Sequence, residues 1–445
     1  RAGTDYFRRE QFNSNTDGPY NANQAIKSEI DAASVFTADP KVAKTHRGMG
    51  FGAVLTFHPD GIARGTSAFV SLADDNENLV VLGDEVAAHY SFDKGSSTQS
   101  YPSSSMGYIS LLRQTYLDAA WYRGMEDKPF TDKSLDAWIA SQELPQIFEV
   151  NNWQSVLRAD KIGDEFDVQY VIKGGGDEYK RIDKIRETGA SMIIPINFPA
   201  AYDVEDPLDA YEVSLAAMKH WELAPTNLAT LAENGIEFAI TPAGIKKGKD
   251  FWANLRTAIG HGLSESEALK ALTYTPAKIL GMEDKVGSLK KGGMANFLIS
   301  SGNLFNKEVI LYENWIQGKP YVLQDMDVLD IAGIYELKVG EDSYDLEIHG
   351  KAGQQKAKIV VNDSTYYPVS MNMGDASLSM NFTPKEEEGA IRLSGWTSGK
   401  DLKGSGQQAN GDWITWEATY VSEKVSDKPS EESGQKSEEN KPEVG

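Results

Sequence analysis

Six polar or ionisable residues could do chemistry because each lies near the end of a predicted strand. They are His58, Asp60, Arg64, Lys173, Asn197 and Thr241. An imidazole titrates near neutral pH and binds zinc through a ring nitrogen, so His58 could be a metal ligand or a general base. His58 could equally hydrogen-bond the backbone of its own turn ahead of Pro59. A lysine at a strand end, such as Lys173, is commonly solvated or paired with a carboxylate.

The histidine spacing and the cysteine content limit the possible metal chemistry. The chain has six histidines, and none forms a His-x-His pair; they are His46, His58, His89, His220, His261 and His349. There is no cysteine, which excludes disulfides, thiolate catalysis and Cys-ligated zinc or iron–sulfur sites. The residues by themselves therefore predict no metal site and no cofactor.

Two other segments invite a catalytic interpretation. The serine-rich loop over 94–106 lacks a nucleophile-elbow pattern, and His89 is the one histidine near it. The glycines at 174–176 fit neither a dinucleotide nor a Walker A fingerprint, and the acidic residues Asp177 and Glu178 that follow would repel phosphate. We expect a polar loop in the first case and a flexible turn in the second.

The predicted elements alternate between strand and helix. Apolar strands are expected over 52–57, 167–173, 192–199 and 236–241, and helices over 107–122, 135–144, 177–187, 210–221 and 227–234. Ser264 is expected to cap a further helix, with Glu267 three residues later. This order is typical of a parallel sheet, whose strand ends share one rim. We therefore expect the six polar residues to lie at that rim.

The segment over 216–300 carries a family resemblance. It contains HGLSESEALKALTYTPAKILGMEDKVGSLKKGGMANFLI, with a Gly-Leu-Ser helix over 262–273 and two turns over 276–281 and 286–292. This string resembles the C-terminal part of the metal-dependent amidohydrolase superfamily, in particular imidazolonepropionase- and prolidase-like members. The resemblance implies a (β/α)8 barrel that closes here and re-enters a small β-sandwich.

The sequence departs from the family where the chemistry would be. The family places an aspartate at the end of the last barrel strand, but this chain reads Ala239-Ile240-Thr241-Pro242-Ala243. In several members a carbamylated lysine bridges two metals, a role that the resemblance would give to Lys173. The histidines that accompany such a lysine are missing from the strands that end near Lys173 and Asn197.

We therefore predict an α/β fold with a TIM-like (β/α)8 barrel, whose first strand can lie outside this sequence, a remnant small β-sandwich and a C-terminal all-β domain. The expected domains are the barrel over 1–300, strands completing the sandwich over 301–326, a β-rich domain over 327–421 and a disordered acidic tail or linker over 422–445.

Composition limits the partners. The net charge of −22 disfavours nucleic acid and anionic membranes, and no apolar run is long enough for a membrane span. The resemblance implies one degenerate unit of a larger tandem bacterial protein, exported to the periplasm or associated with the outer membrane. Its partners would be further domains of the same polypeptide or a protein complex.

Three functional hypotheses follow. The first is a non-catalytic amidohydrolase-like barrel that serves as the scaffold or binding half of a larger protein. The second is a metal-dependent hydrolase of C–N bonds in amides, cyclic amides or peptides, with zinc at a reduced site of His58, Asp60 and Lys173. The third is a carbohydrate- or peptide-binding module centred on Trp396, Trp413 and Trp416 of the C-terminal domain.

Overall fold

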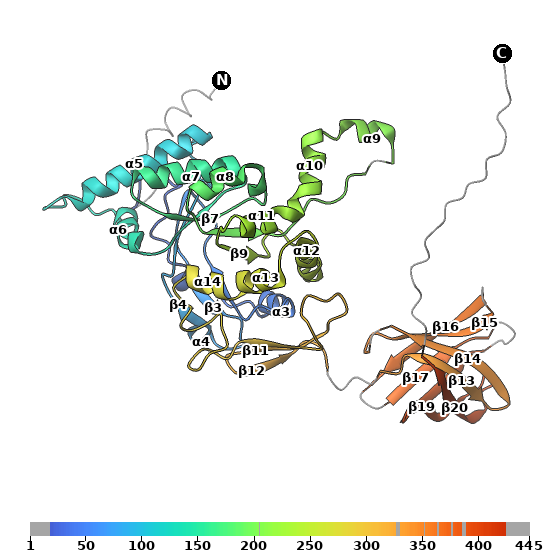
Figure 1. Cartoon of the computed structure of the whole chain (residues 1–445). Coiled ribbons are helices and arrows are strands. Elements are labelled where there is room, and N and C mark those ends of the chain that lie inside the picture. Colours follow the sequence, from blue (N-terminus) through green and yellow to red (C-terminus); the bar gives the residue numbers. More distant parts are fainter. Residues whose placement is uncertain are drawn as a thin grey trace, which may run out of the picture. The chain divides into compact units, whose positions relative to one another are not determined.

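The structure is a computed structural model of the whole chain, and it divides into two compact units, unit 1 over Arg1–Gln324 and unit 2 over Asp325–Gly445 (Figure 1). The described residues are 18–203, 205–325, 330–350, 352–362, 365–374, 377–384 and 389–423. The acidic tail predicted over 422–445 lies outside the described residues from 424 onward.

Unit 1 is built around a six-stranded sheet of order β2-β5-β6-β7-β8-β9. Its strands are β2 (Ala63–Thr66), β5 (Ala88–Ser91), β6 (Gln146–Glu149), β7 (Tyr170–Lys173), β8 (Met192–Pro195) and β9 (Phe238–Thr241). β5 to β9 pair in parallel, and β2 runs antiparallel to β5. The carboxyl ends of the five parallel strands therefore share one edge.

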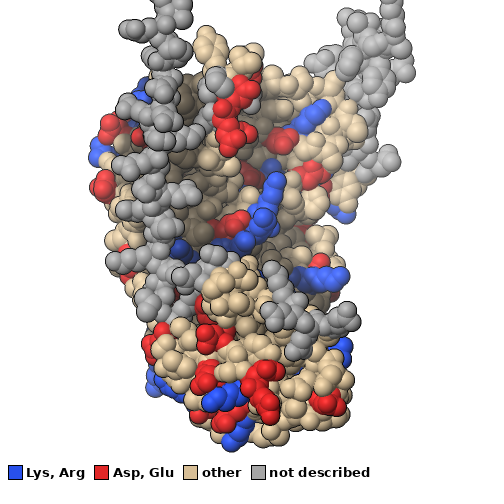
Figure 2. Space-filling view, turned by 90° about the vertical axis from the view of Figure 1, so that its right-hand side faces the viewer, with Lys and Arg blue, Asp and Glu red and all other residues tan. Residues whose placement is uncertain are grey.

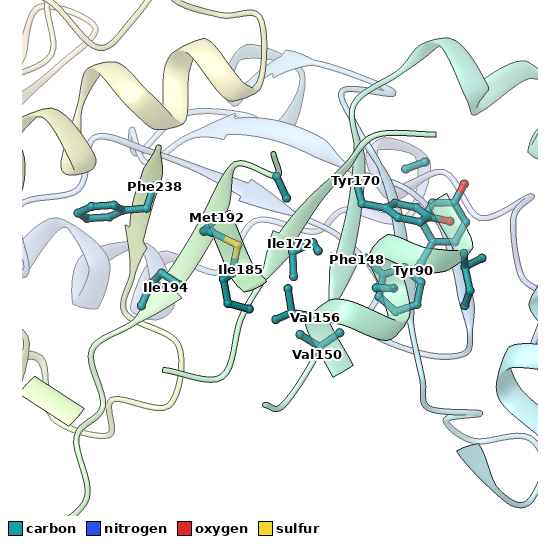
Figure 3. Close-up of a cluster of buried hydrophobic side chains, with 14 of the residues drawn as sticks. Tyr90, Phe148, Val150, Val156, Tyr170, Ile172, Ile185, Met192, Ile194 and Phe238 are labelled. Atoms are coloured by element: carbon teal, nitrogen blue, oxygen red, sulfur yellow. The ribbon is translucent and has the colours of Figure 1, made fainter. Parts of the chain in front are cut away.

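Alternate residues of these strands face opposite sides of the sheet, as the two-residue period requires. One side is a continuous apolar core that includes Tyr90, Phe148, Tyr170, Met192 and Phe238 (Figure 3). Helices α5 (Ser105–Arg123), α6 (Lys133–Ala140), α7 (Trp153–Glu165), α8 (Ile182–Glu187), α11 (Asn227–Glu233), α12 (Gly248–Gly260) and α13 (Glu265–Leu272) contribute to this core. The opposite side carries the residues of the candidate site.

The outer edge of β2 is covered by the chain over 25–31. Lys27 N donates to Ala63 O at 2.9 Å, and Thr66 N donates to Ile30 O at 2.9 Å. Gly65 has a φ of +75°, and a Cβ there would collide with the Ile30 carbonyl oxygen. Glycine is therefore required at this position by both backbone conformation and close approach.

Two three-stranded sheets complete unit 1. One has the order β1-β3-β4, with β1 (Ala53–Thr56), β3 (Ala68–Ser71) and β4 (Val81–Gly83), and the other has the order β10-β11-β12, with β10 (Phe297–Ser300), β11 (Leu311–Ile316) and β12 (Lys319–Val322). They are joined through Asn314 Nδ2, which donates to Phe51 O at 2.9 Å, and through Arg47, which pairs with Asp74 at 2.8 Å and lies over the Tyr321 ring.

The sequence predicted a (β/α)8 barrel, whereas the described residues form the open six-stranded sheet. The difference arises at the predicted strand over 52–57. β1 pairs antiparallel with β3, with Val54 opposite Val70, so it belongs to a separate sheet. His58, which follows β1, was expected to end a barrel strand, and this expectation is wrong for the same reason.

The loop after β8 carries two helices that project from the rest of unit 1, α9 (Pro207–Glu212) and α10 (Leu215–Leu223) (Figure 1). One helix was predicted over 210–221. The chain breaks at Val213, which is extended with ψ near 113°, and Ser214 caps α10 through the Ala217 N–H. No residue of α10 is buried.

The remaining short elements connect these layers. They are α2 (Ala32–Val35), α3 (Pro40–Gly48), α4 (Glu77–Val80), α14 (Tyr274–Ile279) and the 3-10 turns η1 (Ser141–Glu143), η2 (Glu178–Arg181) and η3 (Ala224–Thr226). The helix predicted over 177–187 is thus split between η2 and α8. The predicted cap at Ser264 is confirmed, because its Oγ accepts from Glu267 N at 3.2 Å.

Unit 2 is a closed antiparallel β-barrel, which confirms the predicted C-terminal all-β domain. Its strands are β13 (Gly333–Val339), β14 (Asp342–His349), β15 (Lys356–Asn362), β16 (Thr365–Met373), β17 (Ser377–Phe382), β18 (Ile391–Ser398), β19 (Asp401–Gln407) and β20 (Trp413–Ser422). Alternate apolar residues fill its interior. Trp416 is only 3% exposed and donates to Ser394 O at 3.0 Å, whereas Trp396 and Trp413 are exposed.

Across the described residues, no helix combines the length and hydrophobicity needed to cross a membrane. Acidic and basic side chains are interspersed on the face shown in Figure 2, and uncharged residues cover most of it.

Candidate functional site

A cavity of about 1700 Å³ lies against the second face of the six-stranded sheet. Its floor includes His89, Ile147, Lys173, Ile193 and Ala239, one from each of the strands β5 to β9. Its walls come from β1, β3, β10 and helices α3, α12, α13 and α14, and are largely apolar. A concave, mostly apolar cavity with a few polar groups is the usual form of a ligand site.

One residue of this floor, Lys173, belongs to an ion-pair cluster at the carboxyl ends of β6 and β7. The parallel register places Glu149 opposite Lys173, and Lys173 Nζ donates to Glu149 Oε1 at 2.6 Å. The second oxygen, Oε2, accepts from Arg64 Nη1 on β2. Arg64 is buried, and its Nε also donates to Gly61 O at 3.1 Å. Glu149 therefore bridges two cations.

Electrostatics keep this carboxylate ionised. Burial by itself would raise the pKa of Glu149, but the hydrogen bonds from Lys173 and Arg64 outweigh burial and lower it. Two cations against one anion leave the cluster with one net positive charge.

His89 lies on the same floor and is only 4% exposed. Its ring stacks on Phe57 with centroids 4.0 Å apart and planes 8° from parallel. Burial, and then the positive charge of Arg64, lower its pKa to about 3, so the imidazole is neutral at physiological pH. His89 Nε2 is buried without a hydrogen-bond partner among the described residues. Such an unsatisfied group costs about 1–3 kcal/mol.

The six predicted site residues fall into four sets. Arg64 and Lys173 meet at Glu149, and His58 and Thr241 line the same cavity, His58 as an exposed side chain. Asn197 is exposed and lies against Gly244, away from this floor.

Asp60 has a structural role instead. It pairs with Lys27, and its two oxygens accept from Ser96 N and Ser96 Oγ, each at 2.6 Å. Partial burial acts to raise its pKa, but these hydrogen bonds hold the pKa well below its usual range. Asp60 thus ties the segment over 25–31 to the serine-rich loop. In that loop Ser104 caps α5.

The glycine loop over 174–176 surrounds a carboxylate of its own. Glu178 Oε1 accepts from Gly175 N at 2.9 Å and from Gly176 N at 3.2 Å, and Oε2 accepts from Asn227 Nδ2 at 2.6 Å. Burial raises the pKa of Glu178. Because the Glu178 carboxylate accepts hydrogen bonds from Gly175 N and Gly176 N, these two N–H groups are not available to a phosphate.

The residues present do not fit a zinc site. Among the described residues no group of three His, Cys, Asp or Glu side chains is placed to hold a metal ion. Of the proposed ligands, Asp60 is bound to Lys27 and Ser96, and Lys173 is bound to Glu149.

Sequence reasoning missed Glu149 and His89. Glu149 ends an apolar strand as Lys173 does, so the same strand-end rule applied to β6 would have found it. His89 lies inside β5, and its neighbours Ala88 and Tyr90 point to the opposite side of the sheet. An alternating pattern could indicate that it faces inward, but the pattern does not indicate which partners it meets.

The sequence profile of the Amidohydrolase family matches residues 225–325, which span β9 to β12. The fold is similar to that of an amidohydrolase from Thermotoga maritima MSB8, with a TM-score of 0.54 and 20% identity over 70% of this chain and 83% of that chain. No curated protein matches the sequence.

Two further solved structures match a smaller part of this chain and have lower TM-scores. A Xaa-Pro dipeptidase with bound methionine in its active site has a TM-score of 0.31 and 20% identity over 43% of this chain and 49% of its own. A prolidase described from Bifidobacterium longum has a TM-score of 0.28 and 14% identity over 48% of this chain and 70% of its own. The family match and the Thermotoga fold confirm the predicted resemblance to the amidohydrolase superfamily.

Proposed function

Because residues 225–325 carry an amidohydrolase-family domain, we propose that this chain is a non-catalytic, ligand-binding unit derived from a (β/α)8 amidohydrolase barrel. The observation that carries the proposal is the ion-pair cluster at the rim. Lys173, the cation on the cavity floor, is paired with Glu149, and this carboxylate also binds Arg64.

The pKa values of His89 and of the neighbouring Glu149 support a non-catalytic unit. A general base works best when its pKa lies near the working pH. His89, with a pKa of about 3, is a weak base at neutral pH, and the lowered pKa of Glu149 makes that carboxylate a weak base as well.

The size and lining of the cavity support binding. At about 1700 Å³ it exceeds the roughly 300–1,000 Å³ of a typical small-molecule pocket. Apolar side chains that are half-exposed to this space, such as those of Leu55, Phe57 and Leu298, would be covered by an apolar ligand. Their burial would supply the driving force for binding.

Binding can be measured with N-phenyl-1-naphthylamine, an uncharged dye that fluoresces in apolar surroundings. We expect saturable binding that is weakened at least about tenfold by Ile193→Trp, which fills the floor. The control is Leu117→Trp, which adds the same side chain at an exposed position on α5. Equal binding by both variants would contradict the proposal.

Hydrolysis needs its own measurement. We expect no turnover of dipeptides, cyclic amides or simple amides above background, with or without added zinc. Turnover that disappears together with zinc binding in His58→Ala or Lys173→Met would overturn the non-catalytic assignment in favour of a C–N hydrolase.

The proposal also covers the larger protein to which this chain would belong and its location in the cell. We take the chain to act as one unit of a larger bacterial protein outside the cytoplasm, partnered by further domains or a complex. Co-purification of the full-length protein from the periplasmic or membrane fraction of its source would test this.

A further inference from the structure

We propose that the cavity binds a ligand with an apolar body and a single carboxylate, and that Lys173 at the cationic end of the floor holds the carboxylate. This inference rests on the proposed binding function and names its ligand class. It draws on the net charge of the ion-pair cluster to which Lys173 belongs, on the donors that Lys173 has left for a ligand, and on the charges around His89.

The first step concerns charge. Lys173 on the cavity floor belongs to a cluster with one net positive charge, from Arg64 and Lys173 against Glu149. The aspartates that line other parts of the cavity have their own partners: Asp39 caps α3, Asp74 pairs with Arg47, and Asp75 pairs with Lys319. The positive charge is therefore local to Lys173 on the floor, although other parts of the cavity carry aspartates and the whole chain is acidic.

The second step concerns Lys173 itself. Its ammonium group has three N–H donors and donates one to Glu149 among the described residues. The side chain is 22% exposed and lines the cavity, so the remaining donors can reach a bound group. A carboxylate accepts such charge-assisted hydrogen bonds, whereas an alcohol gains much less from them.

The third step is the unsatisfied imidazole. His89 is more than nine-tenths buried on the same floor, and its Nε2 has no partner among the described residues. Arg64 and Lys173 both act on the ring as positive charges. With Glu149 as the one opposing charge, these two cations leave a net positive charge beside the floor, which favours an anion at Lys173.

The test is competition with N-phenyl-1-naphthylamine by decanoate and by decan-1-ol, which share one chain and differ in the head group. At pH 7.5 we expect decanoate to bind at least about tenfold more tightly than the alcohol. Lys173→Met, which keeps the length of the side chain, should remove this preference and leave decan-1-ol binding unchanged. The matched control is Lys184→Met, an exposed lysine paired with Glu187 on α8.

Glu149→Gln gives a prediction of opposite sign. This change removes the carboxylate that competes for Lys173 and Arg64, so decanoate should bind several-fold more tightly. Thermal unfolding of each variant establishes that it is folded.

The outcomes separate the two levels of the inference. If the dye binds and both competitors displace it equally in wild type and in Lys173→Met, the cavity binds ligands but the carboxylate assignment is wrong. If the dye does not bind to the wild type, the proposed function itself fails. If decanoate loses affinity equally in Lys173→Met and Lys184→Met, a general charge effect replaces the assigned contact.

Discussion

At the scale of single residues, the floor of the cavity is governed by burial and pairing. Glu149 stays ionised because two cations donate to it, and His89 stays neutral because burial and Arg64 both oppose a proton. Both effects depend on side chains brought together from β2, β5, β6 and β7. A group's chemistry here therefore follows from its neighbours more than from its residue type.

His89 should make unit 1 less stable in mild acid. Its folded pKa, about 3, lies below the ordinary value of 6.5, so the unfolded chain binds more protons between these values. The contribution is fully present above about pH 6.5 and is lost as the pH falls toward 3. The free energy of unfolding should therefore drop by up to about 1.4 kcal/mol per pH unit in this window.

His89→Gln checks this expectation by urea unfolding at constant ionic strength between pH 4.5 and 7. The variant should have a shallower pH dependence than the wild type. His46 and His220, whose pKa values are also lowered by burial, remain in both proteins and cancel in the comparison. Identical slopes would show that His89 gains a proton in the folded state.

The site could be predicted from sequence only in part, for reasons visible at individual residues. Lys173 and Thr241, which the strand-end rule selected, both line the cavity, because strand ends follow from local pattern. The rule could not indicate that Asp60 binds Lys27 and Ser96, since these contacts join positions 33 and 36 residues away along the chain. Ion-pair partners depend on strand order, which the local pattern does not contain.

At the scale of elements, the local signals located most helices and strands but not their assembly. The strand predicted over 236–241 is β9, and the helix predicted over 227–234 is α11. β1 was expected to join the main sheet but pairs with β3 instead. An apolar run predicts a strand, whereas the choice of neighbour depends on the whole chain.

Gly65 tests the contact that covers the β2 edge. Gly65→Ala should destabilise unit 1 by about 2–3 kcal/mol, because an alanine there is strained at positive φ and its Cβ collides with Ile30 O. Gly235→Ala is the control, because Gly235 has a φ of +69° with nothing within 4 Å of a Cβ. It should cost only about 1 kcal/mol. Urea unfolding of both variants measures the difference. Equal decreases in the free energy of unfolding would mean that a small backbone shift removes the collision at little energetic cost.

Trp416 and Trp413 of unit 2 allow the effect of removing a buried tryptophan to be compared with that of removing an exposed one. Trp416 fills the barrel interior beside Gly395, where a Cβ would approach the indole ring to 2.6 Å. Trp416→Ala should cost about 3–5 kcal/mol, whereas Trp413→Ala, at a side chain 74% exposed, should change stability by less than about 0.5 kcal/mol. Chemical unfolding followed by circular dichroism distinguishes them. Trp416 therefore cannot serve a ligand surface as the sequence suggested.

At the scale of the whole molecule, the two units have separate hydrophobic cores. The core of the six-stranded sheet runs from Ala25 to Ala271, and the core of the closed barrel runs from Ile331 to Ala418, with no residue in common. Cooperative unfolding requires shared packing, so each unit should unfold as its own transition.

Differential scanning calorimetry of the full chain should therefore resolve two transitions that respond to different substitutions. Trp416→Ala should lower the midpoint of one transition by more than about 10 °C, because 1 kcal/mol corresponds to about 4–8 °C for a domain of this size. Gly65→Ala should lower only the other. Decanoate, if it fills the cavity of unit 1, should raise the transition that Gly65→Ala lowers and leave the one that Trp416→Ala lowers in place. A single transition moved by both substitutions would instead mean that the units are energetically coupled, and ligand binding in unit 1 would then stabilise the barrel as well.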